Sequence, residues 1–156
     1  MSTEESPDKP FDLDRFLPYL LNQAAEATSR SFHALYKSEY GMTRTQWRVL
    51  ANLGRFGEMT ARDICRISHV EKTKVSRAVS AIEAHGWLAR RRHADDRRAE
   101  LLMLTPEGQG VFARLGELAN GYDASLRAAL GSRDAGRLEA MLRRLVAEQP
   151  ADADID

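Results

Sequence analysis

The sequence contains very little cysteine and no long hydrophobic stretch. Its single cysteine, Cys65, cannot by itself form an intramolecular disulfide or a thiolate metal site, which excludes disulfide-rich scaffolds and zinc fingers. The longest uncharged stretch, residues 17–25, is much shorter than the roughly 20 apolar residues that a helix needs to cross a bilayer. We therefore expect a protein without membrane spans whose fold depends on the packing of its side chains.

The motifs on which catalysis and cofactor binding usually depend are also missing. No glycine-rich phosphate loop, nucleophile elbow or pair of catalytic carboxylates appears, and His69, His85 and His93 have no partner at metal-ligand spacing. Residues 1–10 lack the basic start and the apolar stretch of a secretory signal. We therefore predict a cytoplasmic protein that is not an enzyme and that needs no metal or cofactor.

The charges balance overall but are unevenly distributed along the chain. Lysine and arginine together number 23, as do aspartate and glutamate, so the formal net charge is zero. Residues 61–98, however, hold ten basic and five acidic side chains, which leaves this segment at +5 and the remainder at −5. Such a separation indicates one part of the chain that faces a polyanion within an otherwise acidic protein.

The 156 residues, 43% of them hydrophobic, suffice for one compact domain, and their spacing predicts mostly helices. Gly41 ends the first long helix, while the pairs Thr43/Gln46 and Thr60/Asp63 have the spacing of capping boxes or similar helix starts. In chain order, the expected elements are a turn at 12–16, a helix at 18–40, a helix from 44 to 54 or 57, a short helix from 61 that breaks at 68–71, a helix up to 86, strands at 87–92 and 99–104, a helix at 106–130 and a last helix capped by Ser132.

The helix that ends near Gly86 has one apolar face and one face of small polar side chains. At about 100° per residue, Val79 and Ile82 lie close to Val75 on the apolar face. The opposite face carries hydroxyl groups and one arginine: Thr73, Ser76, Arg77 and Ser80. Short hydroxyl side chains allow close approach to a DNA major groove, and arginine pairs bidentately with guanine. A solvated surface helix is the alternative interpretation, although such a helix more often carries Glu and Lys four residues apart.

An arginine-rich hairpin follows this helix directly. Its arginines surround one loop: Arg90, Arg91, Arg92, Arg97 and Arg98. At the tip, the carboxylate of Asp96 is placed to hold the Arg98 guanidinium extended, and a narrow A·T-rich minor groove attracts such an arginine. A short helix, a turn, a second helix and a basic hairpin are together typical of a winged helix-turn-helix. We therefore predict a mainly α fold with a small β-hairpin wing (α+β).

In their order along the chain, these motifs resemble the MarR family of bacterial transcriptional regulators over about residues 16–146. The motifs that carry the resemblance are Thr43-x-x-Gln46-Trp47-x-Val49-Leu50, Lys72-Thr73-x-Val75-Ser76-Arg77, Gly86-Trp87-Leu88, and Asp96-Arg97-Arg98 running on to Leu104-Thr105-x-x-Gly108. The resemblance implies a homodimer, with the first and last two helices intertwined, that presents two winged helices to a pseudo-palindromic operator.

The resemblance also implies roles for particular residues. The major groove would be read by Thr73, Ser76 and Arg77, and the minor groove would be entered by Arg98, oriented by Asp96. The two lysines beside the reading face would contact phosphate, which fixes the register without reading sequence. The predicted DNA-binding residues are Lys72, Thr73, Lys74, Ser76, Arg77, Ser80, Arg91, Asp96, Arg97 and Arg98.

The apolar content of the last two helices favours a dimer independently. Residues such as Tyr122, Leu126 and Met141 form more apolar surface than a small winged helix covers with its own chain; a monomer in which these helices fold back is the alternative. The expected organisation is a disordered segment at 1–11, an N-terminal dimerisation helix at 12–42, a winged helix-turn-helix at 43–105, C-terminal dimerisation helices at 106–148 and a disordered acidic tail at 149–156.

Members of the family commonly bind a small, often aromatic or phenolic acid between the dimer helices and the winged domain. The candidate effector contacts are His33, Tyr36, Trp47 and Phe112, with a role in packing as the alternative interpretation of each. Cys65 is a candidate oxidant sensor by analogy with some relatives. Its position on the apolar side of a short helix instead favours a small buried hydrophobic residue.

Together these patterns predict a sequence-specific DNA-binding transcriptional regulator, a repressor. It binds a pseudo-palindromic operator in double-stranded DNA as a homodimer and is released when a small effector changes the separation of the two reading heads. The alternatives are a winged-helix adaptor that binds protein without DNA, and an enzyme. DNA affinity that falls steeply with salt separates a regulator from an adaptor, and a turnover assay tests for an enzyme.

Overall fold

A computed structural model describes residues 9–149, and its elements follow the predicted order. They are the 3-10 turn η1 (Leu13–Arg15), helices α1 (Leu17–Tyr40), α2 (Arg44–Phe56), α3 (Ala61–Ser68) and α4 (Lys72–Ala84), strands β1 (Leu88–Arg92) and β2 (Glu100–Leu104), and helices α5 (Pro106–Leu130) and α6 (Ser132–Glu148). The predicted disorder at 1–11 and 149–156 falls mostly outside the described residues. No helix within residues 9–149 combines the length and the apolar character required to cross a membrane.

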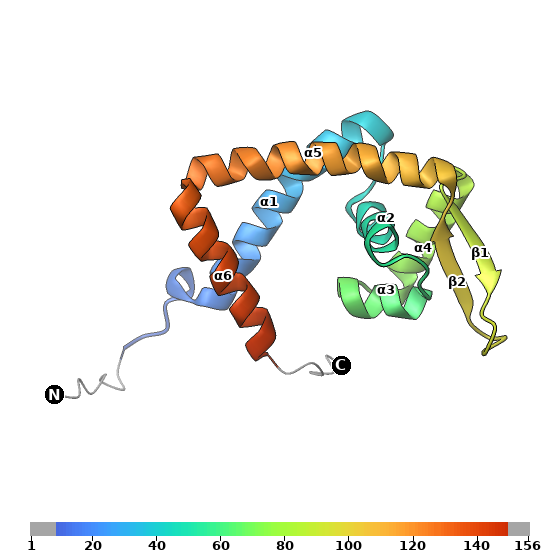
Figure 1. The fold of residues 1–156 in the computed structure, drawn as a ribbon. Coiled ribbons are helices and arrows are strands. Elements are labelled where there is room, and N and C mark those ends of the chain that lie inside the picture. Colours follow the sequence, from blue (N-terminus) through green and yellow to red (C-terminus); the bar gives the residue numbers. More distant parts are fainter. Residues whose placement is uncertain (1–8, 150–156) are drawn as a thin grey trace.

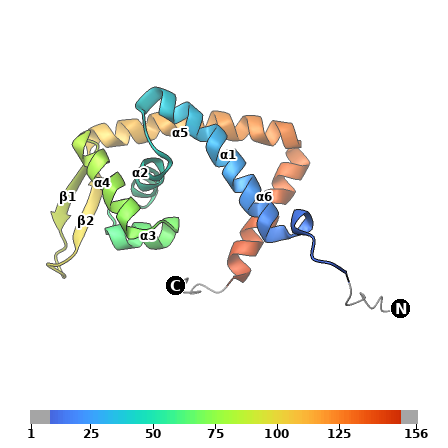
Figure 2. The same ribbon diagram turned by 180° about the vertical axis from the view of Figure 1, so that it is seen from behind.

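Helix α5 connects the two parts of the molecule (Figure 1). Below one end of α5 lie α2, α3, α4 and the β-hairpin, and from its other end α6 descends; Figure 2 shows the same arrangement from behind. Helix α1 begins on the side of the molecule that carries α6, and its later part crosses α5 on the way to the winged part. Because α5 contacts α1, α2, α6 and β2, it relates the position of the winged part to that of the terminal helices.

Local capping interactions explain where the helices begin and end. The predicted capping box of α2 is present, and the similar start predicted for α3 is a capping box as well. In each, the threonine hydroxyl (Thr43 or Thr60) accepts a hydrogen bond from the amide of the third helical residue, and that residue's side chain accepts one from the threonine amide. Gly41 ends α1 at φ 64°, a left-handed conformation that suits glycine. The last cap differs from the prediction, because Gly131 precedes α6 and Ser132 is its first helical residue. Gly131 is the single residue between α5 and α6, and its φ of 85° is a conformation that favours glycine.

The hydrophobic core lies in the winged part. The large side chains with almost no exposed surface come from α1, α2, α3, α4, β2, α5 and the α1–α2 turn: Tyr36, Met42, Leu50, Leu53, Ile64, Ile82, Leu102 and Leu115. The predicted apolar face of α4 is buried as expected, with Val75, Val79 and Ile82 all at 2% exposure or less. Full burial of such aliphatic side chains stabilises a fold by about 1.5–3 kcal/mol each, so α4 is held firmly by its inner face.

The hairpin is attached to this core through its second strand. Strands β1 and β2 pair antiparallel, with Leu88 opposite Leu104 and Arg92 opposite Glu100. The backbone of Leu102 also exchanges two hydrogen bonds with Met59, at 3.1 and 2.8 Å, so an isolated β-bridge joins the segment before α3 to β2. The base of the wing is therefore fixed to the helices, while its tip projects from them.

The opposite end of the molecule is apolar on its surface. Within α6 only Ala135 is buried, and several large side chains of η1, α1 and α6 are substantially exposed: Leu13, Phe16, Leu17, Leu20, Leu138, Met141, Leu142, Leu145 and Val146. So many exposed large apolar side chains at one end of a molecule indicate a contact surface for another molecule.

Candidate nucleic-acid interface and ligand site

Helix α4 presents its polar face to solvent as predicted. Thr73, Ser76, Arg77 and Ser80 are all exposed, opposite the buried valine and isoleucine side chains. Lys72 and Lys74 are exposed in the first turn. Positive side chains at a helix N-terminus add to the partial positive charge of the unpaired amides, so this end of α4 attracts anions.

A concave surface between α3, α4 and the wing gathers basic side chains from all three elements; we name it the basic hollow. It encloses about 510 Å³, and its charged lining residues are Arg62, Lys72, Arg90, Arg92, Arg97, Arg98 and Glu100. Among the described residues that line it, six are cationic and one is anionic; Arg90 is paired with Glu83 and Glu100, and the other five cations form no ion pair within residues 9–149. A concave surface of this charge beside the exposed polar face of α4 suits the phosphate backbone of a duplex.

Two predicted DNA-binding residues have partners within the chain. The Arg91 guanidinium forms an ion pair with the Glu58 carboxylate in the α2–α3 loop, and its Nε lies 3.2 Å from Glu58 Oε1. This contact holds the pKa of Glu58 below its usual range. Asp96 accepts a 3.0 Å hydrogen bond from the backbone amide of Arg98, in place of the expected contact with the guanidinium. Asp96 therefore orders the turn at the wing tip and leaves the Arg98 side chain without this carboxylate.

The sequence interpretation did not single out Arg62 or Arg92 as interface residues. Arg62 is exposed in the first turn of α3, and Arg92 is exposed at the end of β1. Both line the basic hollow together with Lys72. Both arginines belong to the segment 61–98 with its charge of +5, but that charge does not tell which of its cations lie together. Only the packing of α3 against α4 and β2 brings them to the basic hollow.

A second concave surface lies between α1, α2 and α5; we name it the aromatic hollow. It encloses about 380 Å³, and its aromatic and polar lining residues are Thr28, Ser29, Phe32, Tyr36, Arg44, Trp47, Arg48 and Tyr122. The rings form a connected group: Phe32 lies 5.2 Å from Trp47 and 5.5 Å from Tyr122 between centroids. Burial raises the pKa of Tyr36 to about 12, so this phenol stays neutral.

Two of the four predicted effector contacts line the aromatic hollow. Tyr36 and Trp47 do so, with their rings stacked at 5.8 Å. His33 packs against the Tyr36 ring at 5.1 Å but is not among the lining residues. Phe112 packs against the core, where its ring faces Gly54 closely enough to exclude a side chain there. Cys65 is half-buried against the same core, as expected for a small hydrophobic residue.

The aromatic hollow also has a cationic side, whose arginines are not among the predicted effector contacts. Arg44 and Arg48 lie one turn apart on α2, and the Arg44 guanidinium donates to Glu26 at 2.9 Å. This hydrogen bond holds the pKa of Glu26 below its ordinary value. Arg48 makes no ion pair among residues 9–149 and leaves one uncompensated cation at the hollow. In the sequence, the only indication of this cationic side is that Arg44 and Arg48 lie within one helical turn of Trp47.

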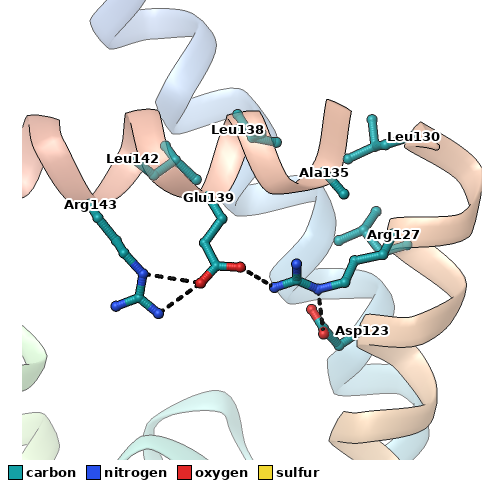
Figure 3. A pocket seen from close by; sticks show the side chains of 9 residues that line it. Asp123, Arg127, Leu130, Ala135, Leu138, Glu139, Leu142 and Arg143 are labelled. Atoms are coloured by element: carbon teal, nitrogen blue, oxygen red, sulfur yellow. Dashed lines mark hydrogen bonds and ion pairs between the residues drawn. The ribbon is translucent and has the colours of Figure 1, made fainter. Parts of the chain in front are cut away.

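A third concave surface, of about 320 Å³, separates α5 from α6 (Figure 3); we name it the apolar hollow. Its apolar lining consists of Leu126, Leu130, Ala135, Leu138 and Leu142. A chain of ion pairs runs along one side, in which Arg127 contacts Asp123 and Glu139, and Glu139 contacts Arg143, each at 2.8 Å.

Comparison with known proteins supports the assignment of the fold. The family model described as "MarR family" matches residues 40–99. The uncharacterized HTH-type transcriptional regulator YwoH of Bacillus subtilis is 29% identical over 66% of this chain and 74% of that protein. The solved structure of the MarR family transcriptional regulator SPO1453 from Silicibacter pomeroyi has a TM-score of 0.76 and 28% identity, over 88% of this chain and 98% of that one.

A more distant structure shows the same fold together with a regulated function. BpsR of Bordetella bronchiseptica, whose DNA binding is regulated by 6-hydroxynicotinic acid, has a TM-score of 0.78 and 20% identity over 91% of this chain and 100% of its own. MarR-family regulators bind DNA as dimers through a winged helix-turn-helix and are not enzymes. Residues 40–99 of this chain match the MarR family, and its motifs, its two-stranded wing and the similarities along most of its length are those of HTH-type, DNA-binding transcriptional regulators.

Proposed function

We propose that this chain is a repressor that binds a pseudo-palindromic operator as a homodimer and leaves it when a small aromatic acid binds. The observation that carries the proposal is the exposed hydroxyl and arginine face of α4 beside the basic hollow. The first surface suits base edges and the second suits phosphates, so the two together favour DNA over a protein partner.

In this proposal α4 lies in the major groove. Thr73, Ser76 and Ser80 approach base edges or phosphates, and Arg77 pairs with a guanine. Lys72 and Lys74 contact phosphates, and we add Arg62 and Arg92 to this group because they line the basic hollow together with Lys72. The exposed tip residues Arg97 and Arg98 reach the adjacent minor groove, whose negative potential is strongest where it is narrow.

The second copy of the chain would cover the apolar surfaces of η1, α1 and α6. Their exposed leucine, methionine and phenylalanine side chains supply apolar surface for the centre of an interface, and the apolar hollow offers a groove for side chains of the partner. Two reading helices related by a twofold axis would then match half-sites about one helical turn apart.

The aromatic hollow is the proposed effector site. Its rings suit a flat aromatic ligand, and the cation of Arg48 suits a carboxylate on that ligand. The regulation of BpsR by an aromatic acid supports this ligand class. Because the hollow is formed by α1, α2 and α5, a ligand there changes how the winged part sits against the dimerisation helices, and this changes the separation of the two heads.

DNA binding is tested first on duplexes selected from a random pool by the protein itself. Arg77→Ala is expected to cost roughly 1–3 kcal/mol on the selected duplex and to relax its sequence preference, while Lys74→Ala weakens selected and random duplexes alike. The affinity of the unaltered protein should fall steeply with salt. Equal losses by both variants on both duplexes would disprove the base-reading role, and no binding to any duplex would favour the adaptor.

The effector site is tested with 6-hydroxynicotinate and its neutral amide as probes. We expect the acid to release the selected duplex and the amide to be much weaker, and Arg48→Gln to remove this difference. Arg55→Gln is the matched control, because Arg55 lies at the far end of α2 over the Phe56 ring. This variant should keep the difference between the acid and the amide. Release by neither probe would exclude this ligand class, and release by both alike would exclude the role of Arg48.

A further inference from the structure

Arg90 differs from the other wing arginines in its partners. It lies in the middle of β1, where its Nε donates to Glu83 Oε2 on α4 at 2.8 Å and its Nη1 donates to Glu100 Oε2 on β2 at 3.1 Å. One guanidinium thus joins the reading helix to both strands of the wing. Its side chain is also only 33% exposed, which is the lowest exposure among the arginines paired in the described residues.

The neighbouring arginine fixes the opposite face of the same strand. Successive side chains of a strand point to opposite faces, so Arg91 points away from α4 and pairs with Glu58 in the α2–α3 loop. The base of the wing is therefore tied to α4 on one face and to the loop before α3 on the other. The arginines of the tip, Arg97 and Arg98, make no such ion pair among residues 9–149.

The charge balance around Arg90 disfavours a phosphate contact. One guanidinium faces two carboxylates, so this group carries a net negative charge. A phosphate that approached Arg90 would compete with both carboxylates and be repelled by them. Hydrogen bonding to Glu83 also raises the pKa of Arg90, which agrees with a guanidinium that is already satisfied within the chain.

We propose that Arg90 is a positioning residue, which sets the angle of the wing to α4 so that the tip arginines and the reading helix meet one duplex together. It acts through Arg97 and Arg98 and contributes no phosphate contact of its own. This inference rests on the proposed entry of the wing tip into the minor groove.

The experiment compares two variants on a selected operator, on the same operator with its A·T flanks replaced by G·C, and on a random duplex. The double variant Arg90→Gln with Glu83→Gln removes the link and conserves net charge. We expect its affinity for the A·T-flanked operator to fall on the order of tenfold, while its affinity for the random duplex and its salt dependence stay unchanged. Arg92→Gln, two residues along the strand in the basic hollow, should weaken all duplexes and lower the salt slope by about 0.9.

A second variant and a second measurement guard against a simple loss of folding. Arg90→Lys keeps the charge, but an ammonium does not reproduce the fork that spans two carboxylates, so it should show the same loss of flank preference. Amide hydrogen exchange should quicken in β1 and β2 and stay unchanged in α2. A salt slope lowered by about 0.9 in the double variant would make Arg90 a phosphate contact and overturn the inference.

The inference and the proposed function fail in different ways. If Arg98→Ala leaves the preference for A·T flanks intact, the wing does not read the minor groove and the proposed DNA contact is wrong. If Arg98→Ala removes that preference while the Arg90 variants retain it, the wing reads DNA without needing the link, and only the positioning role is overturned.

Discussion

At the scale of single residues, Gly108 explains how closely the start of α5 packs against the backbone that leads into β1. A Cβ at this position would lie 2.0 Å from the carbonyl oxygen of Trp87, a distance that no packed atom tolerates. The same carbonyl accepts a hydrogen bond from the amide of Thr105, and the Thr105 hydroxyl bonds Gly86 O at 2.6 Å and accepts from Gly108 at 3.0 Å. Two sequence motifs that are separate in the chain thus meet at one close contact.

Two alanine substitutions in the same helix test this contact. Gly108→Ala should reduce the free energy of unfolding by about 1–3 kcal/mol or more, because the backbone of Trp87 must move. Gly110→Ala is the control, since a Cβ there meets nothing within 4 Å, and it should stabilise α5 by up to about 1 kcal/mol. Urea unfolding at a fixed protein concentration measures both changes. Similar effects of the two substitutions would show that the Trp87 contact is not restrictive.

At the scale of elements, helix boundaries were predictable because their signals are local. The capping boxes of α2 and α3, the glycine after α1 and the Thr-Pro start of α5 each involve residues within four positions of one another. The partners of the wing arginines were not predictable in this way. Arg91 pairs with Glu58, 33 residues away, and Arg44 and Tyr122 meet at one hollow from different helices. Only the packing of elements brings such residues together.

The cap of α2 provides a prediction at this scale. Thr43→Ala removes the hydroxyl that accepts from the Gln46 amide, so we expect a loss of about 1 kcal/mol in the free energy of unfolding. Thr45→Ala, inside the same helix, leaves the cap intact and replaces threonine with a better helix former. Thermal unfolding should place the Tm of Thr43→Ala below that of Thr45→Ala. The reverse order would show that the capping box contributes little.

The α5–α6 ion pairs predict a dependence on pH. Hydrogen bonds from Arg143 and Arg127 lower the pKa of Glu139 from an ordinary value of 4.5. A carboxyl whose pKa is lower in the folded state stabilises the fold above its unfolded pKa, and this contribution is lost as the pH falls through the folded value. The stability difference between the unaltered protein and Glu139→Gln should therefore be present at pH 7 and shrink below about pH 4.5. A difference that is constant with pH would exclude this role of Glu139.

At the scale of the whole molecule, the exposed apolar face of α6 predicts how the oligomer responds to charge. Leu142→Glu places a carboxylate among Leu138, Met141 and Leu145, and we expect it to yield monomers. Ala140→Glu adds the same charge on the far side of the helix and should leave the dimer intact. Light scattering after gel filtration measures the mass of each variant. If Leu142→Glu remains dimeric, the partner does not cover this face.

The same pair of variants separates dimerisation from DNA contact. A monomer engages one half-site, so the affinity of Leu142→Glu for a selected operator should fall on the order of 100-fold, while its affinity for random duplexes should change far less. The Ala140→Glu variant should bind both as the unaltered protein does. A monomeric variant with full operator affinity would contradict recognition by two heads.

Helix α5 has 25 residues, and at 1.5 Å per residue it is about 37 Å long. It spans the distance between Gly131 and the wing, so a tilt of the helix about one end moves the other end. By simple geometry, a tilt of about 5° at one end displaces the other by about 3 Å, close to the rise of one DNA base pair. In the proposed release mechanism, a ligand in the aromatic hollow would therefore need to tilt α5 by only a small angle to misalign the two reading helices with their half-sites.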